Sequence, residues 1–113
     1  MKILRIGCVT LLLPLICTFA HAGAVASSWQ KITEIDSGWD IRRVNIIAPD
    51  IPNPGNMCTA TSKAQADENL ANLDYLMSTA LAAFMAGKEV KLLISDSGCS
   101  AGGYPRIIGI NVR

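Results

Sequence analysis

The side chains best suited to recognising a ligand are two aromatic rings placed next to turns. Trp39 lies beside a predicted hairpin turn, with Asp40 and Arg42 close by in the sequence. Tyr104 lies in a glycine-rich loop near the end of the chain. An aromatic ring bordered by polar groups can stack on a sugar ring or on a partner's side chain. The alternative for each ring is that it folds back over its sheet as core. The candidate ligand-binding residues are Trp39, Asp40, Arg42 and Tyr104.

Few residue types remain for catalysis. The only histidine, His21, lies in an N-terminal segment that we expect to be removed. Its loss excludes Ser-His-Asp and Cys-His catalysis and histidine-ligated zinc. Asp36 and Asp40 flank the predicted turn and could act as acid and base in glycoside hydrolysis, but aspartates in this position are usually turn formers. We therefore expect a protein that is not an enzyme and that holds no metal and no cofactor.

The first 22 residues have the pattern of a secretory signal peptide. Lys2 and Arg5 form a short positive start, residues 6–19 are mostly apolar, and Ala20 and Ala22 stand three and one residues before the expected cleavage point. The alternative is a transmembrane anchor, but an apolar run of about 14 residues is shorter than the roughly 20 that span a bilayer. We expect residues 1–22 to be cleaved and the protein to be secreted or periplasmic, with no membrane span afterwards.

The composition favours one small domain. Half of the 113 residues are hydrophobic and 17% are charged, and the hydrophobic excess lies in residues 1–22. Removing Lys2 and Arg5 from the ten basic residues leaves eight, against nine acidic ones, so the predicted mature chain is nearly neutral. Such a domain lacks the basic surface that binds nucleic acid. Residues 23–113 are predicted to form a single domain with no nucleic-acid partner.

Two cysteines, Cys58 and Cys99, remain after the expected cleavage. An even pair in a small exported domain most simply forms one disulfide, whereas a redox site would need C-x-x-C spacing. The glycines of residues 98–103 could hold an anion through backbone N–H groups, but no P-loop lysine follows them. We therefore predict a structural disulfide, with residues 96–103 as the loop around Cys99.

The first half of the domain is predicted to contain a β-hairpin. Residues 29–34 and 41–48 are rich in Ile, Val, Thr and Trp and flank the turn-forming residues 36–38. In the second of these strands Asn45 and Ile47 alternate with Val44 and Ile46, so one face should be partly solvated. Residues 23–28 are expected to be flexible, and the three prolines in residues 49–56 predict a loop.

Residues 64–86 contain no proline or glycine and are predicted to form the single helix. Ser62 and Gln65 have the spacing of a capping box at its start, and Gly87 is placed to end it. One apolar face, expected to be buried, comprises Leu70, Leu73, Met77, Ala80, Leu81 and Phe84. A second face, either buried or an oligomer contact, comprises Tyr75, Leu76 and Ala83.

Two strands, residues 89–95 and 106–112, are predicted after the helix. In the first of them Val90, Leu92 and Ile94 are expected to share one face, and in the last Ile107 and Ile110 are expected to point to opposite faces. The order strand, strand, loop, helix, strand, strand predicts a mainly β fold with one α-helix (α+β), in which the helix packs on a small antiparallel sheet stapled by one disulfide.

Several features of residues 57–112 occur together in a known group. They are Cys58 before a helix, the Leu-x-x-x-Ala-Leu-x-Ala run that ends at Ala83, Gly87-Lys88-x-Val90 before a strand, Gly98-Cys99, and the closing Ile107-x-Gly109-Ile110 strand. With them this half of the chain resembles the B subunits of subtilase-cytotoxin-type AB5 toxins, which are exported bacterial proteins. The resemblance implies an OB-like barrel, a pentamer with the helix lining its core, binding of sialylated glycans, and a disulfide from Cys58 to the loop between the last two strands. The chain is shorter than those subunits.

These inferences lead to two functional hypotheses. In the first, the protein is an exported non-enzymatic module that binds a glycan or a protein surface, with Trp39 as a stacking ring and Asp40 or Arg42 as polar contacts. In the second, it is a small periplasmic structural or inhibitor protein that binds a partner protein through the loop of residues 49–56.

Overall fold

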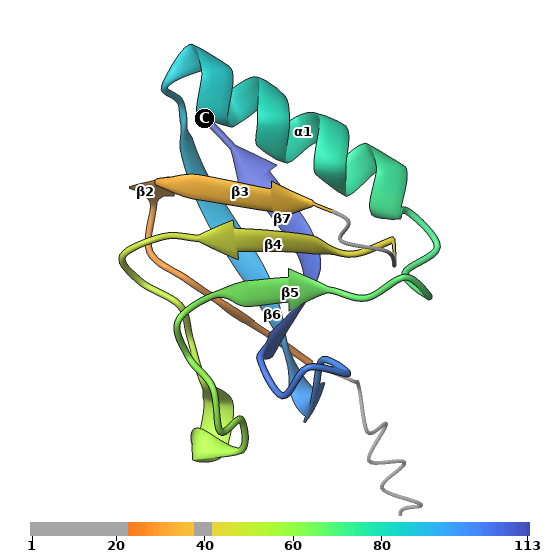
Figure 1. Ribbon diagram of the computed structural model, residues 1–113. Coiled ribbons are helices and arrows are strands. Elements are labelled where there is room, and N and C mark those ends of the chain that lie inside the picture. The colour runs from red at the N-terminus through yellow and green to blue at the C-terminus, as the bar shows by residue number, and fades with distance from the viewer. Residues whose placement is uncertain (1–22, 38–41) are drawn as a thin grey trace, which may run out of the picture.

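The computed structural model describes residues 23–37 and 42–113 (Figure 1). Its elements, in chain order, are β1 (Ala24–Ala26), β2 (Gln30–Lys31), β3 (Glu34–Ser37), β4 (Val44–Ile47), a 3-10 turn η1 (Pro54–Asn56), β5 (Ala64–Ala66), α1 (Leu73–Ala86), β6 (Glu89–Cys99) and β7 (Pro105–Val112). The prediction of a mainly β fold with one helix is confirmed. Within these residues, no helix has the length and apolar character needed to cross a bilayer.

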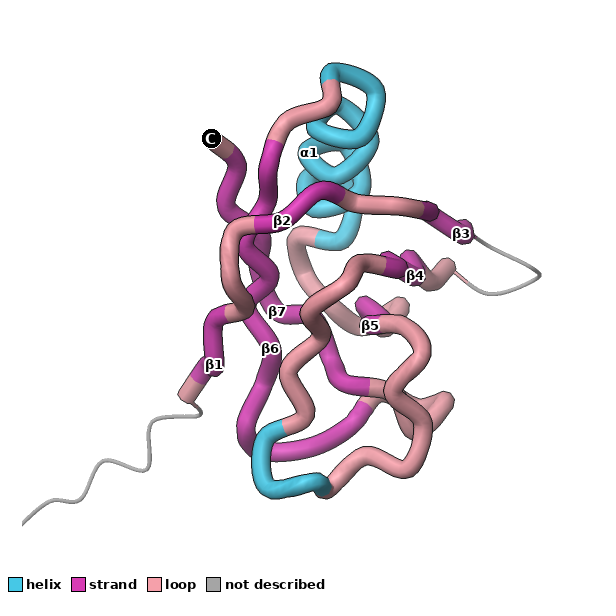
Figure 2. The backbone as a smooth tube through the Cα atoms, turned by 90° about the vertical axis from the view of Figure 1, so that its left-hand side faces the viewer, coloured by secondary structure: helices cyan, strands magenta, loops and turns pink. Residues whose placement is uncertain are grey.

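The seven strands form one open, strongly curved sheet. Its order is β1-β6-β7-β5-β4-β3, and β2 also pairs with β6. Lys31 pairs with β6 and Glu34 pairs with β4, so only Ile32 and Thr33 separate the two ends of the sheet, and the three Cα–Cα steps between Lys31 and Glu34 span at most about 11 Å. The two ends of the open sheet therefore lie close together. Figure 2 shows β1, β6 and β7 on one side, β3, β4 and β5 on the other, and α1 across the top.

The core lies between the curved sheet and α1. Val44 and Ile46 of β4 and Val90, Leu92 and Ile94 of β6 point inward at alternate positions, as the period of two in a strand requires. The buried face of α1 comprises Leu73, Leu76, Ala80 and Ala83. The predicted alternation of both strands is thus confirmed.

The helix is shorter than predicted, and the expected capping box is wrong. Residues 64–66 form β5, which pairs with β4 on one side and, in parallel, with β7 on the other. Ala64 and Ala66 are fully buried there, and a strand satisfies their backbone groups from both sides. Tertiary pairing has overridden a local sequence that favours a helix. The predicted end is confirmed, because Gly87 has φ 65° and donates its N–H to the carbonyls of Ala83 and Phe84.

The predicted buried face of the helix is also partly wrong. Leu81 and Phe84 are 44% and 41% exposed, whereas Leu76 and Ala83, assigned to the second face, are buried. Tyr75 is 79% exposed. The buried residues differ from the predicted ones because α1 begins at Leu73 and packs on β6 and β7 with Leu73 and Leu76 facing the core.

A β-bulge overturns the expected alternation in the last strand. Gly109 pairs with Leu93 but Ile107 pairs with Ile94, so Ile108 is an extra residue. Ile107 is therefore fully buried and Ile110 packs against the same core, on one face instead of two.

The N-terminal predictions also require correction. Residues 24–26, expected to be flexible, form β1 against β6, and Gln30–Lys31 pairs with β6 rather than with β4. Asp36 and Ser37, predicted in the turn, are the last residues of β3, which pairs with β4. The hairpin therefore exists, but it begins later in the chain than predicted.

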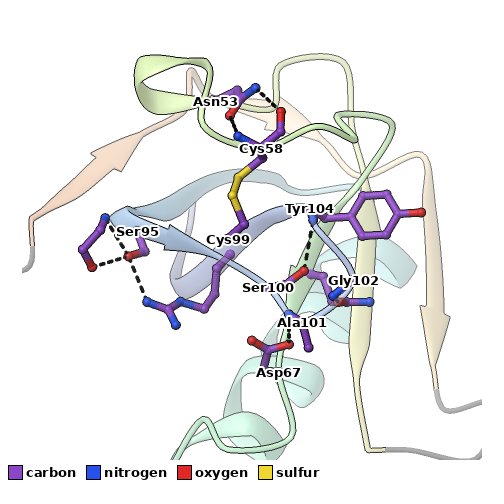
Figure 3. Close-up of a disulfide and its surroundings, with 12 residues drawn as sticks. Asn53, Cys58, Asp67, Ser95, Cys99, Ser100, Ala101, Gly102 and Tyr104 are labelled. Atoms are coloured by element: carbon purple, nitrogen blue, oxygen red, sulfur yellow. Dashed lines mark hydrogen bonds between the residues drawn. A yellow bond between two sulfur atoms is a disulfide. The ribbon is translucent and has the colours of Figure 1, made fainter.

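The predicted disulfide between Cys58 and Cys99 is confirmed, and it ties the loop before β5 to the end of β6 (Figure 3). Asn53 fixes this loop from the other side, since its side chain accepts a hydrogen bond from the N–H of Cys58 and donates one to the carbonyl of Cys58. The loop of residues 49–56 is confirmed and contains only the short turn η1.

Replacing both cysteines by serine should lower the free energy of unfolding by about 4 kcal/mol, because the unfolded chain regains the freedom of a loop of about 42 residues. Urea unfolding followed by circular dichroism measures this difference, with Thr61→Ala as an exposed control close by. An unchanged unfolding midpoint for the double variant would show that the bond does not stabilise the fold.

Candidate ligand-binding face

The outer surface of β3, β4 and β5 carries a row of polar side chains. Asp36 pairs with Asn45, and Asn45 pairs with Gln65, so these residues stand side by side across three strands. Their neighbours in each strand, such as Ile35, Ile46 and Ala64, point to the core. Lys63 stands two residues before Gln65 and shares its face, because side chains alternate along a strand. With the adjacent ring of Tyr104, these residues form what we call the polar face: Asp36, Asn45, Lys63, Gln65 and Tyr104.

Gln65 fixes the centre of the polar face. Its side chain is buried, donates from Nε2 to Oδ1 of Asn45 at 2.8 Å, and accepts at Oε1 the N–H of Gly102 at 3.3 Å. A Cβ on Gly102 would lie 3.0 Å from that Oε1 and 3.1 Å from the Tyr104 ring. A side chain at residue 102 would therefore crowd Gln65 and the Tyr104 ring.

Tyr104 is held over the polar face by its own turn. Ser100 accepts the N–H of Tyr104 at its Oγ, and donates its own N–H to the Tyr104 carbonyl at 2.8 Å. The ring is half-buried, and Nζ of Lys63 lies 5.1 Å from its centre. The same Nζ lies 4.0 Å from Oδ2 of Asp36. Lys63 thus connects an aromatic ring to a carboxylate, and both remain accessible from solvent.

A second carboxylate borders this group. The pKa of Glu34 is raised above its ordinary value by a hydrogen bond to Asp36, by the negative charge of Asp36 and by a small loss of hydration, while Lys63 opposes the shift. Two carboxylates two residues apart on one strand face the same side and repel each other when both are ionised. One edge of the polar face is therefore acidic.

The structure separates the residues predicted from the sequence. Tyr104 belongs to the polar face. Arg42 lies just before β4 and is exposed. It forms an ion pair with Asp74 in the first turn of α1, so it does not belong to the polar face. Trp39 and Asp40 lie outside the described residues.

The sequence prediction missed Lys63, Asn45 and Gln65. Asn45 had been placed on a partly solvated face, which was the available signal. Lys63 and Gln65 were missed because a helix is predicted from residue 64, and a helix there would not pair Gln65 with Asn45.

The loop proposed as a protein-binding segment is firmly held. Asp50 accepts the N–H and the hydroxyl of Ser28, each at 2.8 Å, and these bonds hold the pKa of Asp50 below its ordinary value. Gln30 bonds both the N–H and the carbonyl of Asp50. The first half of this loop is therefore held by hydrogen bonds to the β1–β2 segment.

No cluster of three metal-ligating side chains occurs in residues 23–37 and 42–113. No family model, no curated protein and no solved structure matches this chain.

Replacing Asp36 by Asn should lower the pKa of Glu34 towards its ordinary value, because the repelling charge disappears. Replacing Lys63 by Met should raise it further. Carboxyl resonances followed by NMR across acidic pH measure both changes, and Asp50 serves as an internal control that neither change should move.

The raised pKa of Glu34 also determines how this residue contributes to stability as the pH changes. A raised pKa means that the folded protein binds this proton more tightly than the unfolded chain, so the contribution to stability is present at low pH and is lost as pH rises through the folded pKa. A Glu34 titration that is identical in the wild-type protein and in Asp36→Asn would contradict the coupling.

Proposed function

We propose that the protein is an exported, non-enzymatic module that binds a glycan on the polar face. The observation that carries this proposal is the contact between Lys63 and Tyr104, flanked by the carboxylate of Asp36 and the ordered amide of Asn45. Sugars offer hydroxyl groups that both donate and accept, together with a ring face of C–H bonds. A carboxylate, an amide, an ammonium group and an aromatic ring meet those two requirements.

The ordering of the face favours binding. Gln65 is hydrogen-bonded on both sides, and the Tyr104 turn is closed by its own backbone bonds. Side chains that are already fixed lose less conformational entropy when a ligand binds. Trp39 and Asp40, two and three residues after the end of β3 in the sequence, are kept as candidate contacts. Arg42, which lies just before β4 and pairs with Asp74, is kept as a candidate polar contact outside the polar face.

Export is the second part of the proposal. The Cys58–Cys99 disulfide fits an oxidising compartment, and residues 1–22 have the pattern of a cleaved signal peptide. We therefore place the mature protein in the periplasm or outside the cell.

Self-association is the third part, and it follows the resemblance to AB5 toxin B subunits. The outer side of α1 is apolar, since Leu81 and Phe84 are 44% and 41% exposed and Met85 is 78% exposed. Along its other flank an open groove of about 480 Å³ is lined by small residues such as Ala82 and Ala86. Contiguous exposed apolar residues on a small domain favour contact with another protein surface. We propose that this surface is another copy of the chain.

A glycan array probed with labelled protein tests the ligand class. The wild-type protein should bind at least one carbohydrate, and Tyr104→Ala should weaken that binding about tenfold or more, as loss of a central aromatic contact does. Tyr75→Ala, which removes an exposed ring on α1, is the matched control and should leave binding unchanged. Lys63→Met serves as a second variant, because it leaves the Tyr104 turn intact.

An empty array with the wild-type protein would exclude the glycan proposal. In that case a single partner protein captured in stoichiometric amount from periplasmic extract, and lost when exposed residues of the loop 49–56 are changed, would favour the structural or inhibitor protein instead.

Light scattering coupled to size exclusion tests self-association. The wild-type protein should elute as an oligomer, and the pair Leu81→Glu and Met85→Glu should elute as a monomer, because charge on this face would have to be buried at the contact. Glu68→Lys, an exposed change before α1, is the control. A wild-type monomer at high protein concentration would exclude an oligomer built on α1.

A further inference from the structure

A small cavity of about 210 Å³ lies beside the polar face, between the end of β5, the turn before α1 and the start of β7. Its lining residues are Asp67, Asn69, Leu70, Arg106, Ile107 and Ile108. Pockets for drug-sized ligands have volumes of roughly 300–1,000 Å³, and a single water occupies about 30 Å³. The cavity therefore has room for one small molecule.

Arg106 lines this cavity and has hydrogen-bond donors that are not fully used. Its Nη2 donates to Oγ of Ser95 at 3.3 Å, while its Nε is buried and has no hydrogen-bond partner. A guanidinium carries five N–H groups, and a buried donor without a partner is costly. Ser95 lies within β6, and Figure 3 shows its hydroxyl receiving this bond.

Asp67 brings unused acceptors. Its Oδ1 accepts the N–H of Ala101 at 3.2 Å (Figure 3), and a carboxylate has about four acceptor positions in all. Among the ion pairs of the described residues, none includes Asp67 or Arg106. Opposite charges thus line one cavity without contacting each other.

A ligand that carries both a negative and a positive group could pair with both Arg106 and Asp67. A carboxylate matches the planar donors of arginine, and an ammonium group matches a carboxylate with an amide beside it, here Asn69. Leu70 and Ile108 add an apolar wall. The lining contains no aromatic ring to stack on a sugar, so the cavity differs in chemistry from the polar face.

We propose that this cavity binds a free α-amino acid with an apolar side chain, whose carboxylate meets Arg106 and whose ammonium group meets Asp67. The apolar side chain lies against Leu70 and Ile108. This site is independent of the glycan proposal, because neither Asp67 nor Arg106 belongs to the polar face.

The test uses L-leucine and two analogues that each lack one charge, with the full isotope-labelled protein observed by NMR. We expect L-leucine to shift the amide resonances of Asp67, Asn69 and Ile108 with a dissociation constant of about 1 mM or below. 4-Methylpentanoate lacks the ammonium group and leucinamide lacks the carboxylate, so each should bind about tenfold more weakly or worse.

Matched variants locate the site. Asp67→Asn keeps an acceptor for Ala101 but removes the charge, and it should weaken leucine binding about tenfold while leaving 4-methylpentanoate unaffected. Glu68→Gln removes a neighbouring exposed charge outside the cavity and should change neither. Arg106→Lys keeps the charge but loses the planar donors, and it should weaken both ligands.

Three results would overturn the proposal. L-leucine and 4-methylpentanoate could bind equally, which would make this an anion site. A neutral monosaccharide such as methyl glucoside could shift the same resonances more strongly, which would make it part of the glycan site. Finally, none of the ligands could shift these resonances at about 10 mM, far above the expected dissociation constant.

Discussion

The pairing of β5 on both of its sides is the constraint on which the rest of the structure depends. This strand of three residues is hydrogen-bonded to β4 on one side and to β7 on the other, so it joins the two halves of the curved sheet. Its two alanines are fully buried in the core. Because side chains alternate, the outward positions around β5 are Lys63, Gln65 and Asp67. The polar face uses Lys63 and Gln65, and the cavity uses Asp67.

Gln65 shows how one residue can serve both fold and site. Its buried amide costs free energy unless all of its hydrogen-bonding groups are used. Bonds to Asn45 and to the N–H of Gly102 use both ends of the amide, and they also fix the loop that carries Tyr104. The same loop donates the N–H of Ala101 to Asp67. The glycine-rich loop therefore separates two surfaces of different chemistry, one with an aromatic ring and one with a guanidinium.

Sequence reasoning succeeded where local signals and the tertiary structure agree. The alternation of Val90, Leu92 and Ile94, the end of the helix at Gly87 and the pairing of Cys58 with Cys99 were all predictable. It failed at Ala64–Ala66, where the local sequence favours a helix but the residues form a strand, because they pair with β4 and β7, which are distant in the chain. It also failed at Ile108, because nothing in a run of apolar residues indicates a bulge. The same contrast between local and tertiary signals applies to the candidate site. Tyr104 was found from its place in a loop, whereas Lys63 and Gln65 depended on a strand that only the whole fold creates.

Backbone measurements on residues 63–72 test this account most directly. If β5 is the strand that joins the two halves, the amides of Ala64 and Ala66 should be among the slowest to exchange with solvent, and Gln65 should show an NMR contact to Arg106 on the parallel strand. Contacts between residues three apart through positions 64–72, with no contact from Gln65 to Arg106, would mean a helix there. That result would remove the polar face and the cavity together.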